Sequence, residues 1–207
     1  MLLLHHSPLS PYVRKVMVVL HETGQLGSVK LSPAAGSPVD PASMPTGLNP
    51  LGKIPALERP DGCTLYDSRV ICRFLAGRDP SGAALYPAPP RLWESLTLEA
   101  TADGIMDAAL AARYETALRP QPLQWPDWVA GQWEKVTRSL DAAEARWTGH
   151  LAGPPCIGQI ALGCALGYLD LRFADRPWRE GRPALADWFT RFAAHPAMQA
   201  TAPPGPA

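Results

Sequence analysis

The stretch Asn49-Pro50-Leu51-Gly52-Lys53-Ile54-Pro55-Ala56-Leu57 decides how the rest of the chain is organised. Pro55 has no backbone N–H and a fixed φ, so a strand begins at this proline and does not run through it. The proline also pushes Ile54 into an extended conformation. If the Ile54–Pro55 bond is cis, the backbone N–H and C=O of Ile54 point outward and are free to pair with an extended, peptide-like ligand. An ordinary turn before a strand is the alternative at this point.

Strand and helix signals on both sides of this stretch predict a small α/β layer. Residues 1–5 form a short apolar strand, residues 11–24 have apolar side chains at helical spacing, and residues 28–31 form a weak second strand. After a loop, residues 56–59 and 63–66 predict a hairpin around a Pro-Asp-Gly turn, and a helix opens at Asp67-Ser68. The order is strand, helix, strand, loop, strand, strand, helix.

Everything after residue 90 has helical patterning. Residues 78–90 are rich in proline and glycine, so we predict a domain at 1–77, a linker at 78–90 and an all-helical domain at 91–207. Apolar stripes run through residues 92–118, 129–147, 157–171 and 185–192. The third of these has no charge before Asp170, which predicts a helix buried on nearly all sides.

Composition excludes several classes of protein. The 19 basic and 19 acidic residues give a net charge of zero, so no nucleic-acid or anionic-membrane partner is expected. The nearly uncharged run of residues 154–169 is too short to span a bilayer, and the first residues lack the basic region of a signal peptide. The 4 cysteines form no C-x-x-C and no metal-ligand spacing, so we expect small buried thiols in a reducing compartment.

Four motifs now combine with this organisation: Ser10-Pro11-Tyr12-Val13-Arg14-Lys15-Val16, the stretch Asn49 to Leu57, Tyr66-Asp67-Ser68, and the apolar run Gly158 to Asp170. Together they resemble the soluble glutathione transferases, of the bacterial serine type, over essentially the whole chain. The resemblance implies an α/β thioredoxin-like N-terminal domain (βαβ-ββα) plus an all-α C-terminal domain, the glutathione transferase fold. It also implies a cis Pro55, a glutathione site without metal, a cytoplasmic homodimer and a role in detoxification.

Ser10 is the residue to which the resemblance assigns the chemistry, although by itself it reads as a helix N-cap. In serine-type transferases the matching hydroxyl donates a hydrogen bond to the glutathione sulfur. A free thiol with a pKa of about 8.5 is only slightly ionised at pH 7. One charge-assisted hydrogen bond contributes roughly 1.5–3 kcal/mol and a helix N-terminus roughly 0.3–2 kcal/mol. At about 1.4 kcal/mol per pKa unit, the two lower the thiol pKa by roughly one to three units without a general base.

Ser7 is the rival to Ser10. Its spacing to Arg14 matches the catalytic serine of the zeta-like isomerases, but their Ser-Ser-Cys motif is replaced here by Ser7-Pro8-Leu9. We favour Ser10. Tyr12 is a third donor type, but it falls inside the helix start and reads better as pocket wall or core. No cysteine stands at position 7 or 10, so a mixed disulfide with the enzyme is not expected.

The remaining glutathione contacts carry over from the matching motifs. By resemblance Lys53 reaches a glutathione carboxylate, Ile54 pairs its backbone with the cysteinyl residue, Ser68 holds the γ-glutamyl carboxylate and Asp67 faces the ammonium. A solvated turn lysine and a plain Asp-Ser helix cap are the alternatives from the residues alone.

The second substrate, a small hydrophobic electrophile, is expected between the two domains. Candidate wall residues on the long helix are Met106, Leu110, Arg113 and Tyr114. The electrophile cannot be read from the sequence, so isomerisation, dehalogenation and glutathione-dependent reduction on the same site remain alternatives. A non-catalytic binding or scaffold protein is the alternative from another class.

One motif departs from the family. The core helix usually opens with a Ser/Thr-x-x-Asp capping box, and here the same place is Cys156-Ile157-Gly158-Gln159. Gln159 is able to reach back to the backbone of the cap, but a cysteine caps poorly. We therefore expect a weaker start to this helix and no effect on the chemistry.

Overall fold

The computed structural model describes residues 1–204, and the last three residues of the predicted second domain, 205–207, lie outside them. The chain divides into two compact units. The first contains Met1–Pro87 and the segment that begins at Pro196, and the second contains Ala88–His195.

The first unit is built on a four-stranded mixed sheet in the order β2-β1-β3-β4. Its strands are β1 (Leu2–His6), β2 (Val29–Pro33), β3 (Ala56–Glu58) and β4 (Thr64–Leu65). β1 pairs in parallel with β2, antiparallel β3 follows, and β4 pairs antiparallel with β3. This is the predicted thioredoxin-like arrangement. β2 ends two residues later than predicted and β4 is shorter at both ends, because strand ends are the least regular part of a pattern.

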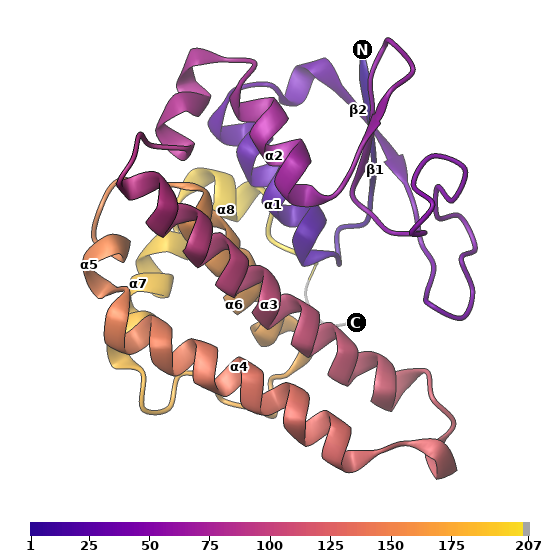
Figure 1. The fold of residues 1–207 in the computed structure, drawn as a ribbon, viewed down its shortest axis with the longest axis vertical. Coiled ribbons are helices and arrows are strands. Elements are labelled where there is room, and N and C mark those ends of the chain that lie inside the picture. The colour runs from indigo at the N-terminus through magenta and orange to yellow at the C-terminus, as the bar shows by residue number, and fades with distance from the viewer. Residues whose placement is uncertain (205–207) are drawn as a thin grey trace. The chain divides into compact units, whose positions relative to one another are not determined.

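Two helices lie together on one face of this sheet (Figure 1). They are α1 (Pro11–Glu22) and α2 (Ser68–Ala76), and short 3-10 turns η1 (Leu26–Ser28) and η2 (Pro80–Leu85) follow them. The apolar side chains that the sequence placed on their inner faces are buried, among them Val16 and Ile71 with no exposed surface. Each such side chain contributes roughly 1.5–3 kcal/mol when it is removed from water.

The domain boundaries differ from the prediction in two places. The segment predicted as linker contains η2, whose Leu85 is buried, and its residues up to Pro87 belong to the first unit. The short helix α8 (Pro196–Ala200) also belongs to the first unit. Arg14 of α1 donates a hydrogen bond of 3.0 Å to the carbonyl oxygen of Met198, and the Met198 side chain is buried. This long-range contact leaves no periodic signal in the sequence.

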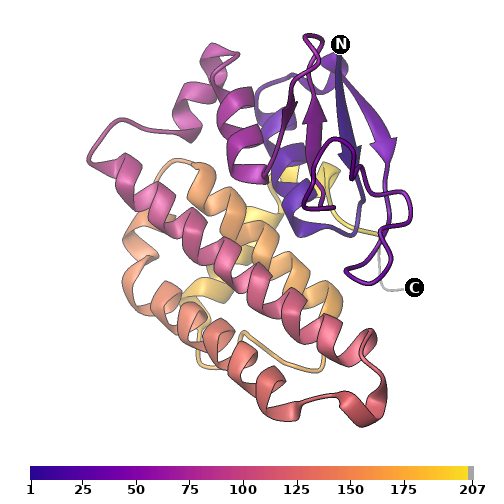
Figure 2. The ribbon, with the colours of Figure 1, turned by 45° about the vertical axis from the view of Figure 1, so that its right-hand side comes forward.

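The second unit is entirely helical in its described residues (Figure 2). Its elements are α3 (Arg91–Ala117), η3 (Gln121–Leu123), α4 (Pro126–Arg146), α5 (Thr148–Leu151), α6 (Ile157–Arg172) and α7 (Pro183–Ala193). α3 packs against both α6 and α4. At Gly158 a Cβ atom would lie 2.6 Å from the carbonyl oxygen of Ser95, so glycine permits the close approach of α6 to α3. Among the described residues, no helix has the length and apolar character needed to cross a membrane.

Helix α6 confirms the prediction of a helix buried on nearly all sides, since all of its first ten residues are buried. Its N-terminus corrects the expected capping. Cys156 makes no side-chain cap bond, and Gln159 does not reach back to it. The Gln159 amide instead donates to the carbonyl oxygens of His150 at 2.9 Å, Gly153 at 3.3 Å and Leu151 at 3.4 Å. The His150 carbonyl oxygen also accepts the Gly153 N–H at 3.1 Å, so the buried Gln159 amide adds a second donor there and supplies a donor to the carbonyls of Leu151 and Gly153.

Candidate functional site

Three segments of the first unit come together at one edge of its sheet. β1 and β3 are antiparallel with His5 opposite Ala56, and β3 and β4 are antiparallel with Leu57 opposite Leu65. The end of β1, the start of β3 and the end of β4 therefore share an edge. The predicted site residues follow or precede these strand ends directly, so the sheet brings together Ser7–Ser10, 53–55 and 66–68.

Ser10 is the N-cap of α1, with an extended backbone at φ −84° and ψ 120°. Pro11 follows at the first helical position, which its fixed φ suits. The Ser10 Oγ accepts a hydrogen bond of 3.3 Å from the Val13 N–H. Because a hydroxyl carries one donor besides its acceptor sites, this cap bond leaves the O–H of Ser10 free to donate to a further group.

Ser7 lies in the turn that leads to Ser10. Its carbonyl oxygen accepts the Ser10 N–H at 3.1 Å, and its Oγ accepts the Leu9 N–H at 3.4 Å. Both hydroxyls are half-buried, but only that of Ser10 stands at a helix N-terminus. Tyr12 is half-buried at the second position of α1.

The loop before β3 is closed by Asn49, whose side chain is buried with 2 % exposure. Its Nδ2 donates to the Lys53 carbonyl oxygen at 2.8 Å, and its Oδ1 accepts the Leu51 N–H at 3.1 Å. Gly52 takes a positive φ of 60° within the loop. The sequence flagged this stretch but missed the role of Asn49; an asparagine that opens a tight Pro-Gly loop is the signal for such an Asx-type closure.

The Ile54–Pro55 peptide bond is cis in the structure, as expected. The Lys53 carbonyl held by Asn49 belongs to the same peptide group as the Ile54 N–H. Among the described residues, neither the N–H nor the C=O of Ile54 has a hydrogen-bond partner. A backbone donor and acceptor are thus available at the sheet edge, directly before Pro55.

Helix α2 opens at the same edge. Asp67 is its N-cap and accepts the Arg69 N–H at 2.9 Å, and Ser68 is buried at the first helical position. The plain capping role that the sequence offered for Asp67 is therefore present. It leaves the second carboxylate oxygen of Asp67 available, because the cap bond uses Oδ1.

Charged groups near this edge are unevenly paired. Lys53 is exposed and forms no ion pair with the described residues. His5 on β1 contacts Glu58 on β3 with 2.7 Å between Nε2 and Oε1. Burial lowers the pKa of His6, the last residue of β1, so its ring favours the neutral form at neutral pH. The Lys53 ammonium is therefore an unpaired positive charge at this edge.

The candidate wall residues of the second substrate lie on α3 in the second unit. Leu110, Arg113 and Tyr114 are half-buried, whereas Met106 has no exposed surface and is core. Burial raises the pKa of Tyr114, opposed by the charge of Arg113, so the phenol is neutral at pH 7. In the described part of the chain, no group of three or more His, Cys, Asp or Glu side chains is arranged to hold a metal ion.

Comparisons with known proteins match nearly the full length of the chain. Sequence models of the glutathione S-transferase N-terminal and C-terminal domains match residues 9–78 and 126–191. A glutathione transferase family member from Pseudomonas fluorescens Pf-5, solved with bound glutathione, is 47% identical with a TM-score of 0.96, over 99% of this chain and 100% of that one. The uncharacterized GST-like protein YibF of Escherichia coli is 32% identical over 94% of this chain and 95% of its own length.

Glutathione S-transferase 3 of Zea mays is also 32% identical, over 96% of this chain and 91% of its own length. The two domain models match in this order along the chain, and this chain covers between 91% and 100% of the length of these three relatives. The chain therefore belongs to the glutathione S-transferase family.

Proposed function

We propose that this chain is a glutathione transferase, which binds glutathione at the sheet edge of the first unit and activates its thiol through Ser10. The observation that carries the proposal is the convergence of Ser10, the Ile54 peptide group and Asp67-Ser68 at one edge. The proposal also draws on the relative from Pseudomonas fluorescens that was solved with glutathione bound.

In this proposal the glutathione thiolate accepts a hydrogen bond from the Ser10 hydroxyl. The cap bond to Val13 fixes the position of Oγ and leaves its proton free for the sulfur. The N-terminus of the twelve-residue helix α1 adds its partial positive charge. The two effects together shift the thiol pKa down by roughly one to three units, on the values of each interaction in proteins. The thiolate then attacks the electrophile without a general base.

The rest of glutathione is held by groups of complementary charge and hydrogen bonding. The N–H and C=O of Ile54 pair with the cysteinyl residue in the manner of an added strand. The exposed Lys53 ammonium attracts the glycyl carboxylate as a point charge. The Ser68 hydroxyl and the N-terminus of α2 hold the γ-glutamyl carboxylate, and the free oxygen of Asp67 faces the ammonium.

The electrophile is proposed to contact half-buried side chains of α3, namely Leu110, Arg113 and Tyr114. Met106 is withdrawn from this set because it has no surface on which to meet a ligand. Apolar side chains with one cation suit a small hydrophobic molecule with an electron-withdrawing group. Conjugation is the reaction that needs nothing beyond the activated thiolate.

The test is calorimetric titration of glutathione into the purified chain, with an ultraviolet difference spectrum for the thiolate. We expect binding between micromolar and low-millimolar concentrations and a thiolate band near neutral pH. Ser10→Ala should abolish the band while glutathione still binds, and Ser7→Ala, which removes a hydroxyl three residues away, is the matched control. Absence of binding would overturn the proposal in favour of a non-catalytic protein. A band lost only in Ser7→Ala would overturn the assignment of Ser10.

We also propose a cytoplasmic homodimer. The proposal of assembly rests on large apolar side chains that face solvent in the single chain, such as Trp93 with 62% exposure. The cytoplasmic assignment rests on the four cysteines, which form no disulfide with one another, as in a reducing compartment. Sedimentation equilibrium gives the assembly directly. A mass of one chain at micromolar concentration would contradict the dimer.

A further inference from the structure

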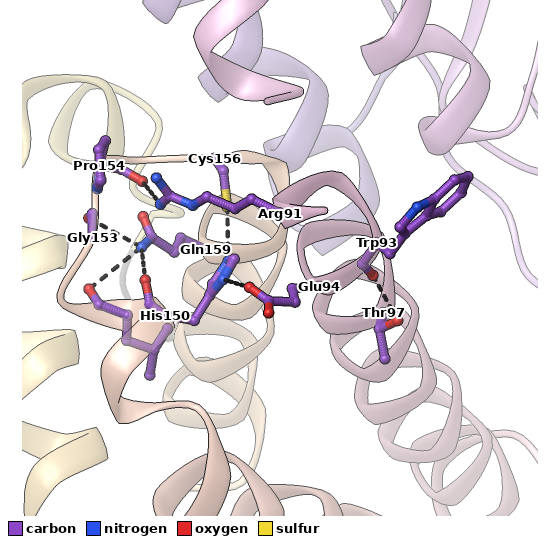
Figure 3. Close-up of polar contacts among 10 residues, drawn as sticks. Arg91, Trp93, Glu94, Thr97, His150, Gly153, Pro154, Cys156 and Gln159 are labelled. Atoms are coloured by element: carbon purple, nitrogen blue, oxygen red, sulfur yellow. Dashed lines mark hydrogen bonds and ion pairs between the residues drawn. The ribbon is translucent and has the colours of Figure 1, made fainter. Parts of the chain in front are cut away.

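A cysteine, a histidine and a glutamate form a chain of contacts in the second unit, and none of the three belongs to the proposed glutathione site (Figure 3). The His150 Nε2 lies 3.2 Å from the Cys156 Sγ, and the His150 Nδ1 lies 3.4 Å from the Glu94 Oε2. The three side chains come from different elements: Glu94 from α3, His150 from α5 and Cys156 from the N-cap of α6.

The surrounding chain fixes this arrangement from several directions. Gln159 donates to the carbonyl oxygens around the α5–α6 loop, as described above. Arg91 donates to the Pro154 carbonyl oxygen at 2.8 Å, and a Cβ at Gly153 would lie 2.7 Å from the Arg91 guanidinium. The ring of Trp147 meets His150 edge-on with centroids 5.6 Å apart. A base held this firmly beside a thiol needs little rearrangement to act.

The partners determine the roles of the two ring nitrogens. A carboxylate only accepts hydrogen bonds, so Nδ1 carries the proton that it shares with Glu94. Nε2 is then unprotonated and accepts from the Cys156 S–H. This tautomer is inferred from the partners. A nucleophile beside a base that a third group orients is the arrangement found around activated thiols and hydroxyls.

We propose that Cys156 is an oxidation site for water-sized hydroperoxides, with His150 as its base. The sulfur attacks one oxygen of hydrogen peroxide, an S–O bond forms and the O–O bond breaks. His150 takes the thiol proton and delivers it to the departing oxygen, which leaves as water. Cys156-SH and H₂O₂ thus give Cys156-SOH and H₂O, with the sulfur oxidised by two electrons and the peroxide reduced by two.

Burial sets which oxidants can react. Cys156 has 1% exposure and the His150 side chain 6%, whereas the Glu94 side chain has 62%. The chain that leads into Cys156 is exposed at Ala152, Pro154 and Pro155, so the segment that carries the thiol runs along the surface. Peroxide is close to water in size, but a maleimide is not. Cys63 is the opposite case, because its thiol is exposed to reagents but has no histidine base among its contacts in the described residues.

The experiment compares the two thiols under two reagents in the folded protein. One sample is treated with hydrogen peroxide and another with N-ethylmaleimide. Both are then denatured, labelled with a heavy alkylating reagent and quantified for each cysteine by peptide mass spectrometry. We expect peroxide to consume Cys156 about tenfold faster than Cys63, since general-base assistance is worth at least this factor. We expect maleimide to consume Cys63 first.

Variants separate the base from simple burial. His150→Phe keeps an aromatic ring against Trp147 and should slow peroxide oxidation of Cys156 about tenfold without changing Cys63. Glu94→Gln, at an exposed position where folding is safe, should slow it by a smaller factor, because the Glu94 contact is the longer one. His21→Phe on α1 is the matched control and should change neither rate. Faster oxidation of Cys63 than of Cys156, or no effect of His150→Phe in the folded protein, would overturn the proposal.

Discussion

Helices α1 and α6 begin in opposite ways, although each opens with a residue whose side chain ends in a single OH or SH group. Ser10 caps α1 through its Oγ and remains half-buried, with a proton to spare. Cys156 opens α6 without any cap bond, is buried, and turns its sulfur to His150. The first helix end is therefore available to a ligand, and the second is buried in the protein. We call the sheet edge with the start of α1 the open region, and α6 with the α5–α6 loop the closed region.

The difference shows that a helix N-terminus serves either to bind a ligand or to pack inside the protein. At α1 the unsatisfied N–H groups of a helix end and a free hydroxyl proton provide a place for an anion. At α6 the neighbouring polar groups are consumed internally, with Gln159 serving the carbonyls of α5. Changes at α6 should therefore alter stability, and changes near the sheet edge should alter ligand affinity.

Gln159→Met should give the largest change in stability. Methionine has a similar shape but no donor, so the carbonyl oxygens of Leu151 and Gly153 lose the donor that Gln159 supplies, and that of His150 keeps only the Gly153 N–H. Leaving such groups unpaired costs about 2–3 kcal/mol, measured as the free energy of unfolding in urea. Gln124→Met is the matched control, because Gln124 also donates to two carbonyl oxygens, those of Thr116 and Arg119, but at an exposed loop. Equal losses in the two variants would contradict the contrast between closed and open regions.

Tyr168 on α6 gives the closed region a pH dependence. Burial raises its pKa to about 12 against an ordinary value of 10.0, with smaller opposing effects from Arg113 and Arg172 and a reinforcing one from Tyr114. The folded state therefore keeps its phenol proton where the unfolded chain loses it. This contribution is complete below pH 10 and is lost as the pH rises toward 12, at about 1.4 kcal/mol per pH unit.

Tyr168→Phe removes this group from the titration. We expect the free energy of unfolding of the wild type to fall relative to that of Tyr168→Phe by about 1 kcal/mol between pH 10 and pH 11. Tyr114→Phe should give a smaller relative change, because the pKa of Tyr114 is raised less. Parallel curves for wild type and Tyr168→Phe would show that the phenol is not shielded in the closed region.

The sequence predicted the open region better than the closed one, for physical reasons. Ser10, Pro55 and Asp67 act through local rules of capping and backbone restriction, which a short motif contains. The Cys156–His150–Glu94 contacts join residues up to 56 positions apart, and no spacing reports them. Gln159 was noticed but given the wrong partner, because the sequence shows a capping box and not the neighbouring helix end. The return of α8 to the first unit was missed for the same reason.

Asn49→Ala tests whether the loop before β3 positions the Ile54 peptide group in the open region. It removes the donor that holds the Lys53 carbonyl and thereby frees the peptide group of Ile54 to rotate. We expect glutathione affinity to fall about five- to tenfold in calorimetry, equivalent to about 1–1.4 kcal/mol for one lost hydrogen bond. Leu51→Ala, in the same loop but 65% exposed, is the control and should bind normally. Unchanged affinity in Asn49→Ala would mean that the loop is ordered without this side chain.

Cys156→Ser tests whether a side-chain cap at residue 156 stabilises the start of α6. The backbone at this position is extended, at φ −144° and ψ 173°, so a serine hydroxyl has the geometry of a cap. We expect the free energy of unfolding to rise by about 0.5–1 kcal/mol, since a good cap replaces a poor one. Serine also lacks the sulfur, so peroxide should leave the variant without the modification assigned to residue 156. A loss of stability would instead show that the sulfur–imidazole contact, rather than any cap, secures the start of α6. In that case the two helix ends differ in the interaction that stabilises them, a cap hydrogen bond at α1 and a side-chain contact at α6, as well as in their access to ligands.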